Sequence, residues 1–137
     1  MNHILPLNEQ EKQTITKILR NWSNKSKTKM TLDGLIKEWA NFVSDVEHCY
    51  DDSIYEYTND LSVRDILKDI LDTVQESARI KIEEILKPLD ARFNESTIEI
   101  KRALVPIIQQ NASSWWFRIP KKLSKELEDD LRSEGLI

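Results

Sequence analysis

Few residues of this 137-residue chain could form a catalytic centre. Its one cysteine, Cys49, directly follows His48, and adjacent side chains on a helix diverge by about 100°, so the two are poorly placed to form a thiolate pair. The other histidine, His3, is distant in sequence, and no second Cys or His stands at the spacing of a zinc site. We therefore expect no catalytic residue, metal or cofactor, and a protein that is not an enzyme.

Carboxylates are the abundant functional groups, and they gather in the middle of the chain. The formal net charge is −4, but residues 1–29 carry +4, residues 30–99 carry −10 and residues 100–137 carry +2. The 26 residues from Glu38 to Val63 contain seven carboxylates and neither Lys nor Arg. A surface with this charge steers a basic partner toward itself.

Three tyrosines stand among these carboxylates in the segment CYDDSIYEYTND, residues 49–60. Tyrosine supplies a large contact area with a hydrogen-bonding tip, and such an anionic surface can compete with phosphates for a nucleic-acid-binding cleft. Alternatively, the tyrosines anchor a connecting loop to the core and the carboxylates keep that loop soluble. The candidate residues for binding a basic partner are Asp45, Tyr50, Asp51, Asp52, Tyr55, Glu56, Tyr57 and Asp60.

A second conspicuous feature is the sequence WWFR, residues 115–118. Adjacent residues of an extended segment point to opposite faces, so we expect one tryptophan in the core and the other near the surface. The preferred interpretation is a wedge that fixes the C-terminal helix to the bundle. An exposed tryptophan beside Arg118 would instead anchor an interface.

A basic stretch near the N-terminus offers a different kind of site. Lys25, Lys27 and Lys29, with Arg20 and Trp22 nearby, could contact phosphates. Neither a helix-turn-helix pair nor an RNA-binding aromatic motif accompanies them. A solvated loop is the preferred interpretation.

The elements that must position these residues are helices in the first part of the chain. Asn8 and Glu11 have the spacing of a capping box, which predicts a first helix over residues 8–22. Thr31 can cap a second helix, in which apolar residues keep to one face as far as Tyr50. The polar residues between these two helices predict a loop.

The middle of the chain is expected to interrupt this pattern. Residues 54–60 predict a short helical turn or a loop, and Ser62 with Asp65 forms another capping box that opens a third helix. A further apolar stripe begins at Ala78, and Pro88 should kink that helix or split it into two pieces.

Indications conflict toward the C-terminus. Residues 97–108 combine strand-like alternation with a helical pattern that Pro106 would disturb, and we favour helix. The segment SSWWFRI should be extended, because Pro120 restrains the residue before it and suits the first turn of a helix. A leucine stripe over residues 123–131 predicts a last helix that ends at Gly135.

Composition favours a single helical domain. Two glycines and four prolines are too few for a many-turned β sandwich or a glycine-rich phosphate loop. A chain of this length can bury one adequate core, and no repeat or long linker divides it. We expect an all-α fold over residues 1–137, a single compact bundle of about six or seven helices with an extended Trp-rich segment before the C-terminal helix.

The sequence also yields an expectation for the compartment. Residues 1–12 lack the basic segment and long apolar run of a secretion signal. No stretch approaches the roughly 18 apolar residues of a membrane span. We therefore expect a cytoplasmic protein without a membrane partner.

Three sequence blocks carry a family resemblance: YDDSIYEYTNDLSVRDIL, then LDARF, then WWFRIPKKL. Their order resembles that of small bacterial immunity proteins from contact-dependent growth-inhibition and related polymorphic-toxin systems, over residues 35–130. The resemblance implies a cytoplasmic protein that binds a cognate toxin domain, commonly a nuclease, and blocks its active site or substrate groove. It carries over no interface residue and does not identify the toxin.

We therefore expect a non-enzymatic immunity protein that neutralises a basic toxin through its acidic, Tyr-rich surface. The main alternative is a nucleic-acid-binding regulator or antitoxin that uses the basic loop at residues 25–29. A third hypothesis is a small helical enzyme whose surface carboxylates hold a divalent cation.

Overall fold

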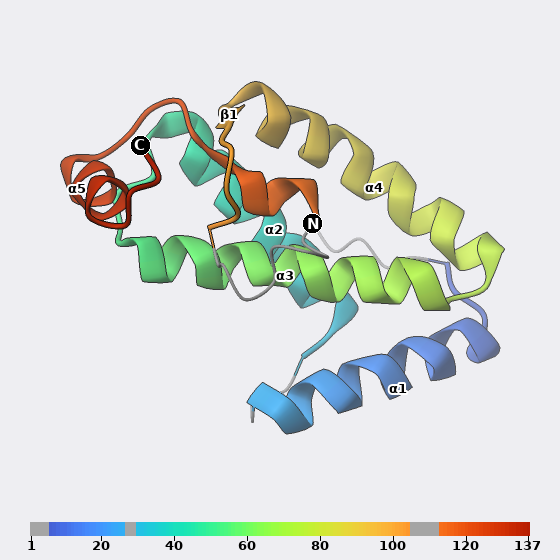
Figure 1. The fold of residues 1–137 in the computed structure, drawn as a ribbon. Helices are drawn as coiled ribbons and strands as arrows, with labels where there is room; N and C mark the ends of the chain where they lie inside the picture. Colours follow the sequence, from blue (N-terminus) through green and yellow to red (C-terminus); the bar gives the residue numbers. More distant parts are fainter. Residues whose placement is uncertain (1–5, 27–29, 105–112) are drawn as a thin grey trace.

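The computed structural model describes residues 6–26, 30–104 and 113–137 (Figure 1). The chain is mostly helical in these ranges, as predicted, but they contain five α-helices rather than six or seven, together with a short 3₁₀ helix and two short strands. In chain order the elements are α1 (Glu9–Ser26), α2 (Leu32–His48), α3 (Ile54–Thr73), α4 (Glu76–Glu95), β1 (Thr97–Glu99), η2 (Ser114–Phe117), β2 (Arg118–Pro120) and α5 (Lys125–Ser133).

The central element is α3, which contacts α1, α2, α4, α5 and η2. In Figure 1, α1 lies along one side of α3, while α4 and the C-terminal elements lie on the other side. Helices α2, α3 and α4 enclose most of the core, whose largest fully buried apolar side chains include Trp39, Tyr57, Leu61, Leu67, Ile70, Ile82 and Leu86. None of the helices within the described ranges has the length and apolar character needed to cross a bilayer.

The first two helices begin as predicted. Asn8 and Glu11 form a reciprocal capping box, in which each side chain accepts the backbone N–H of the other at 2.8 Å. The Oγ1 atom of Thr31 accepts the N–H of Gly34 at 3.0 Å and so caps α2. Helix α1 continues past its predicted end to Ser26, because no glycine or proline follows to stop it.

Helix α3 runs without a break through the segment predicted as a turn or loop. Ser53 is its N-cap, and the Ser53 side chain accepts the N–H of Glu56 at 3.3 Å. The predicted capping box at Ser62 is wrong, since Ser62 lies inside the helix and its hydroxyl donates to the carbonyl of Asn59 at 2.5 Å. A serine hydroxyl within a helix can bond back to the preceding turn, so this spacing alone does not mark a helix start.

Helix α4 is one element although it contains Pro88. A proline removes one backbone N–H and crowds the preceding turn, which costs about 3 kcal/mol inside a helix. The opposing contribution is burial of Ala78, Ile82, Leu86 and Phe93 on the other face, while Pro88 itself is exposed. The predicted division of this helix into two pieces is therefore wrong.

The residues that follow α4 form a strand. Strand β1 pairs antiparallel with β2, and Ile98 stands opposite Ile119. The helix that we favoured over residues 97–108 is thus wrong for residues 97–104, and the rest of that range lies outside the described residues. An isolated strand is not stable, so the pairing with β2 decides this structure.

The last helix starts later than Pro120 suggested and ends where predicted. Pro120 is the final residue of β2, and α5 begins after Ser124, whose side chain accepts a first-turn N–H at 3.2 Å. Gly135 has a φ of 70°, and the N–H of Leu136 donates to the carbonyl of Leu131 at 2.9 Å. This is the usual way in which a glycine in the left-handed region closes a helix.

Candidate functional site

Two of the three tyrosines predicted to form a binding surface face the core instead. Tyr57 is fully buried and donates its hydroxyl to the carbonyl of Arg118 at 2.9 Å, while Tyr50 is 4% exposed. The rings of Tyr50 and Tyr57 meet edge to face at 5.2 Å, and both pack against Phe42. The helical spacing of Ile54, Tyr57 and Leu61 turns Tyr57 inward. The prediction of a surface role is therefore wrong for Tyr50 and Tyr57.

Tyr55 alone of the three tyrosines lies at the surface. It is 81% exposed, the highest value among the large apolar side chains of the described ranges. Asp51, Asp52 and Glu56 are also exposed around the start of α3. The predicted acidic surface with a tyrosine at its centre therefore exists at this end of α3, with one tyrosine rather than three.

A hollow of about 620 Å³ lies between α2 and α3 and extends to Trp22 of α1. Glu38 and Asp45 of α2 line it because a spacing of seven residues places them two turns apart on one face. Asp60 of α3 lines the opposite wall. We call this hollow, with its three carboxylates, the acidic groove. Its apolar lining consists of Trp22, Met30, Leu35, Phe42, Val63 and Ile66.

The carboxylate of Asp60 is held in place but not neutralised. Its Oδ2 atom accepts the hydroxyl of Tyr50 at 2.7 Å. Burial raises the pKa of the Asp60 carboxyl above its ordinary value, and the hydrogen bond from Tyr50 opposes this rise. The charges of Glu56, Asp45 and Asp52 raise that pKa further. The groove therefore has a negative potential that a bound cation would relieve.

Within the described ranges, the other groove carboxylates also have no cationic partner. In the part of the chain that the structure describes, neither Lys nor Arg forms an ion pair with Glu38, Asp45 or Asp60. Of the seven carboxylates between Glu38 and Val63, Glu47 differs, because Arg92 of α4 binds it through Nε at 2.9 Å and through Nη2 at 2.5 Å. Glu47 thus joins α2 to α4 and is not available to a partner.

A feature that the sequence analysis missed is the use of aspartate as an acceptor for every tryptophan. All four indole N–H groups donate to an aspartate carboxylate of α3 or α4. The pairs are Trp22 with Asp69 at 2.9 Å, Trp39 with Asp90 at 3.0 Å, Trp115 with Asp65 at 2.9 Å and Trp116 with Asp65 at 2.8 Å. Buried indole N–H groups need such a partner, but sequence does not indicate which of the many carboxylates supplies it.

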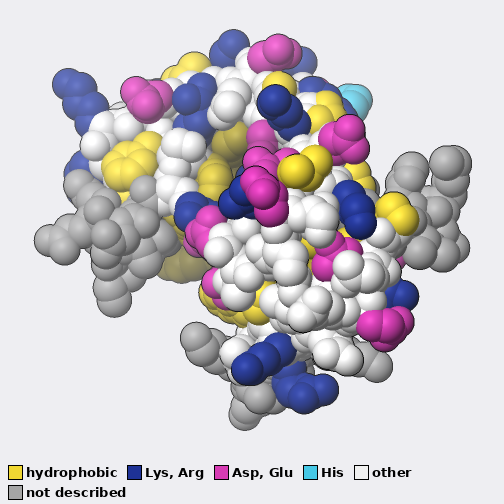
Figure 2. All heavy atoms as spheres, turned by 90° about the vertical axis from the view of Figure 1, so that its right-hand side faces the viewer, with side chains coloured by type: hydrophobic (Ala, Val, Ile, Leu, Met, Phe, Trp, Pro, Cys, Tyr) yellow, Lys and Arg dark blue, Asp and Glu magenta, His cyan; other side chains and the backbone are white. Residues whose placement is uncertain are grey.

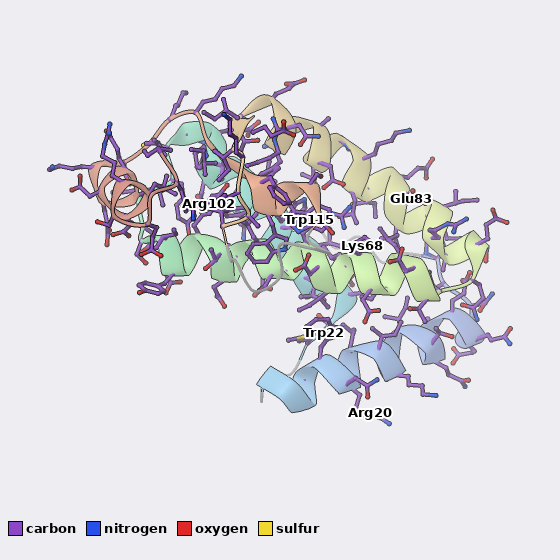
Figure 3. The ribbon with its side chains drawn as sticks, viewed as in Figure 1. Arg20, Trp22, Lys68, Glu83, Arg102 and Trp115 are labelled. Atoms are coloured by element: carbon purple, nitrogen blue, oxygen red, sulfur yellow. The ribbon has the colours of Figure 1, made fainter. Side chains whose placement is uncertain are left out.

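The two adjacent tryptophans converge rather than diverge. Residues 114–117 form a 3₁₀ helix instead of an extended segment, so Trp115 and Trp116 reach the two oxygens of one carboxylate, Asp65. Burial raises the pKa of Asp65, and the two indole hydrogen bonds oppose that rise. Figure 3 shows Trp115 above α3, on the opposite side from Trp22. The prediction of opposite faces is wrong, although Trp116 is buried and Trp115 is only partly buried. The interpretation as an internal anchor agrees with these contacts.

Arg64 completes this internal network. Its guanidinium binds Asp90 through Nε at 3.0 Å and Nη2 at 2.8 Å, and its central carbon lies 4.7 Å from the ring centroid of Trp115. Its Nη1 atom is buried and has no hydrogen-bond partner among the residues that the structure describes. Asp90 and the ring of Trp115 together hold this charge inside the fold.

The remaining candidates form no centre of their own. Cys49 is exposed, and His48 bonds through Nδ1 to the carbonyl of Ser44 at 2.8 Å rather than to a thiol. In the described ranges no group of three or more His, Cys, Asp or Glu residues could hold a metal ion. The loop predicted at residues 25–29 is wrong for residues 25 and 26, which belong to α1, while residues 27–29 and the side chains of residues 25 and 26 lie outside what the structure describes.

Comparison of the chain with protein-family models, curated proteins and solved structures finds no match.

Proposed function

We propose that this chain is an immunity-type inhibitor, which binds a basic protein toxin through the acidic groove and the exposed surface around Tyr55 and performs no catalysis. The observation that carries the proposal is a concave site whose three carboxylates have no cationic partner in the described chain. Soluble proteins usually interleave charges of both signs on their surfaces. Figure 2 shows such a face, where Lys and Arg side chains stand among Asp and Glu.

The groove suits the side chain of a lysine or an arginine. Val63 and Ile66 offer apolar surface for the aliphatic stem of such a residue, and Asp45 and Asp60 offer acceptors for its charged head. A cation bound there would lower the pKa of Asp60 toward its ordinary value. A charge pair that is partly shielded from water contributes more to affinity than one at the rim of an interface.

A stable complex requires more surface than the groove provides. Specific interfaces bury about 800 Å² on each partner, so the toxin would also cover the adjoining end of α3. There Tyr55 is the large aromatic side chain, and Asp51, Asp52 and Glu56 surround it with negative charge. Aromatic residues at such positions commonly dominate binding energy.

The two buried tyrosines, Tyr50 and Tyr57, lie beneath this surface and fix the position of Asp60. Tyr50 donates to Asp60 and so fixes the direction of its carboxylate. Tyr57 packs under Tyr50 at 5.2 Å. Because Asp60 is already oriented, binding does not incur the entropic cost of ordering that side chain. The block order that resembles immunity proteins supports the same proposal.

The proposal expects the open reading frame next to this gene to encode a large secreted protein with a variable C-terminal toxin domain, and the decisive test uses that domain. Association of that domain with the variant Glu38→Lys/Asp45→Lys/Glu56→Lys should slow by at least about tenfold at low salt, and less at high salt, because like charges now meet. Glu84→Lys changes an exposed carboxylate of α4 and is the matched control. It should associate like the wild type.

Two outcomes would contradict the proposal. Unchanged association of the triple variant, in a protein still folded by circular dichroism, would exclude the acidic groove as the interface. Salt-dependent binding of the wild type to DNA or RNA in a mobility-shift assay, without binding to the toxin domain, would favour the alternative that uses the basic residues 25–29.

A further inference from the structure

A second hollow lies between α1 and the start of α2, on the other side of Met30 and Thr31 from the acidic groove. Its volume is about 550 Å³, which lies within the range of small-molecule sites. Apolar side chains form its floor, and we call it the α1–α2 trough. The floor residues are Leu7, Ile15, Leu19, Met30 and Leu32.

One edge of the trough is polar and follows a single flank of α1. Thr16, Arg20 and Ser23 line this edge at spacings of four and three residues, which places them in one row along the helix. Along this row, Arg20 lies between the two hydroxyl-bearing residues Thr16 and Ser23. Figure 3 shows Arg20 on the side of α1 that faces away from α3, whereas Trp22 points toward α3.

The charge around the trough favours an anion. Arg20 is exposed and forms no ion pair within the described chain, and Lys12 adds a second cation, whose nearest carboxylate is Glu9 at 3.7 Å. Asp33 is the one carboxylate among the lining residues. The first-turn N–H groups of α2, at Leu32 and Asp33, add positive potential at the same rim.

We propose that the α1–α2 trough binds a free fatty acid, whose hydrocarbon chain lies on the apolar floor and whose carboxylate meets Arg20. A guanidinium binds a carboxylate in a bidentate fashion, and the hydroxyl of Thr16 or that of Ser23, each about one turn from Arg20, can donate to the same group. A small inorganic anion would leave the apolar floor exposed to water, so a hydrocarbon chain is part of the ligand. This site is separate from the acidic groove and does not depend on the function proposed for it.

The test is calorimetric titration of the full chain with dodecanoate below its micellar concentration. We expect saturable binding with one site, at least about tenfold tighter than binding of dodecyltrimethylammonium, which has the same tail and an opposite charge. Acetate, which has the head group without the tail, should not bind. Equal affinity for both amphiphiles, binding of acetate, or no saturable binding of dodecanoate would each overturn the proposal.

Substitutions of lining residues test whether dodecanoate binds in the trough. Arg20→Glu should weaken dodecanoate binding by at least about tenfold, and Thr16→Trp should block the trough. Lys17→Glu makes the same charge change at an exposed residue of α1 that does not line the trough, and it should bind normally. Normal binding by folded Arg20→Glu and Thr16→Trp would overturn the assignment. Binding to phosphatidylglycerol vesicles without binding of free dodecanoate would overturn it in favour of a membrane surface.

Discussion

Carboxylates on two sides of α3 have opposite surroundings. On the side of α4 and η2, Asp65 and Asp90 each accept two or more hydrogen bonds from tryptophan or arginine side chains. In the acidic groove, Glu38 and Asp45 have no such partner among the described residues, where Asp60 has only the hydroxyl of Tyr50. The two regions use the same residue types, yet one holds the fold together and the other leaves its charge for a partner.

The paired region explains how the elements are joined. Its hydrogen bonds link residues that are distant in sequence, such as Trp39 with Asp90 and Trp115 with Asp65. Each bond satisfies a donor that folding removes from water, so the loss of one acceptor leaves an orphaned group. Among the three groove carboxylates, within the described ranges, Asp60 alone makes such a bond, to Tyr50. Mutations in the two regions should therefore affect stability with opposite signs.

The largest expected effect is at Asp90. Replacement by alanine removes the partner of the buried Arg64 and of the Trp39 indole, which should lower the free energy of unfolding by about 3 kcal/mol. Urea unfolding followed by tryptophan fluorescence measures the change. Asp72→Ala, which removes an exposed ion pair with Lys68, is the control and should change stability by less than about 0.5 kcal/mol. Equal effects of the two variants would contradict the structural role of Asp90.

Asp65→Ala should follow in size. It leaves two indole N–H groups without an acceptor, so we expect a loss of about 2 kcal/mol in the free energy of unfolding. The emission of Trp115 and Trp116 should also change, because both rings lose their fixed positions. Asp65→Asn retains one carbonyl acceptor and should lie between the wild type and the alanine variant. Identical stability of all three proteins would show that the two indoles do not need this carboxylate.

Glu11 is a third kind of carboxylate, buried and hydrogen-bonded, whose contribution to stability should depend on pH. Hydrogen bonds from the Ser77 hydroxyl and the Asn8 backbone hold the pKa of this buried carboxyl below its usual value of 4.5. Such a group stabilises the fold above its unfolded pKa, and this stabilisation is lost as the pH falls through the folded pKa. Glu11→Gln should therefore be less stable than the wild type at neutral pH, and the difference should shrink in acid. Chemical denaturation over this pH range measures it, and a difference independent of pH would contradict the assignment.

The acidic groove should respond in the opposite direction. Asp45→Asn/Asp60→Asn removes mutual repulsion and retains an acceptor for Tyr50, so the free energy of unfolding should rise by about 0.5 kcal/mol. The same variant should bind the toxin domain more weakly. Stability is measured by urea unfolding, and affinity by calorimetry. A clear loss of stability would show that these carboxylates belong to the structural network.

Tyr55 should have the smallest effect on stability. Its side chain is 81% exposed, so Tyr55→Ala should change the free energy of unfolding by less than about 0.5 kcal/mol. If Tyr55 anchors the interface, the complex with the toxin domain should dissociate at least about tenfold faster. Surface plasmon resonance measures this rate. Unchanged dissociation would remove Tyr55 from the proposed interface.

Local patterns were predicted well where one element decides the outcome. The capping box at Asn8 and Glu11 and the N-cap at Thr31 are confirmed, because such bonds form within a few residues. The similar spacing at Ser62 and Asp65 misled, since Asp65 bonds to tryptophans about fifty residues away. A spacing rule cannot show that a distant donor competes for the same side chain.

The candidate site was predicted only in part, because its charge follows from the sequence but the direction of its side chains depends on distant contacts. The absence of Lys and Arg between Glu38 and Val63 indicated an acidic surface, and the structure brings Glu38, Asp45 and Asp60 into one hollow. The orientation of Tyr50 and Tyr57 was not predicted, because an unbroken α3 turns Tyr57 inward and Tyr50 follows into the same cluster.

The sequence by itself determined the mostly helical character, several helix ends and the excess of negative charge in the middle of the chain. These depend on composition and on contacts within one or two turns. Only the tertiary structure decided which carboxylates are neutralised, since Trp39, Trp115 and Arg64 find their partners across the core. It also decided that β1 is a strand, because its partner β2 follows only after residues 100–117. A charge left unpaired after folding is thus a property of packing, which a linear sequence does not contain.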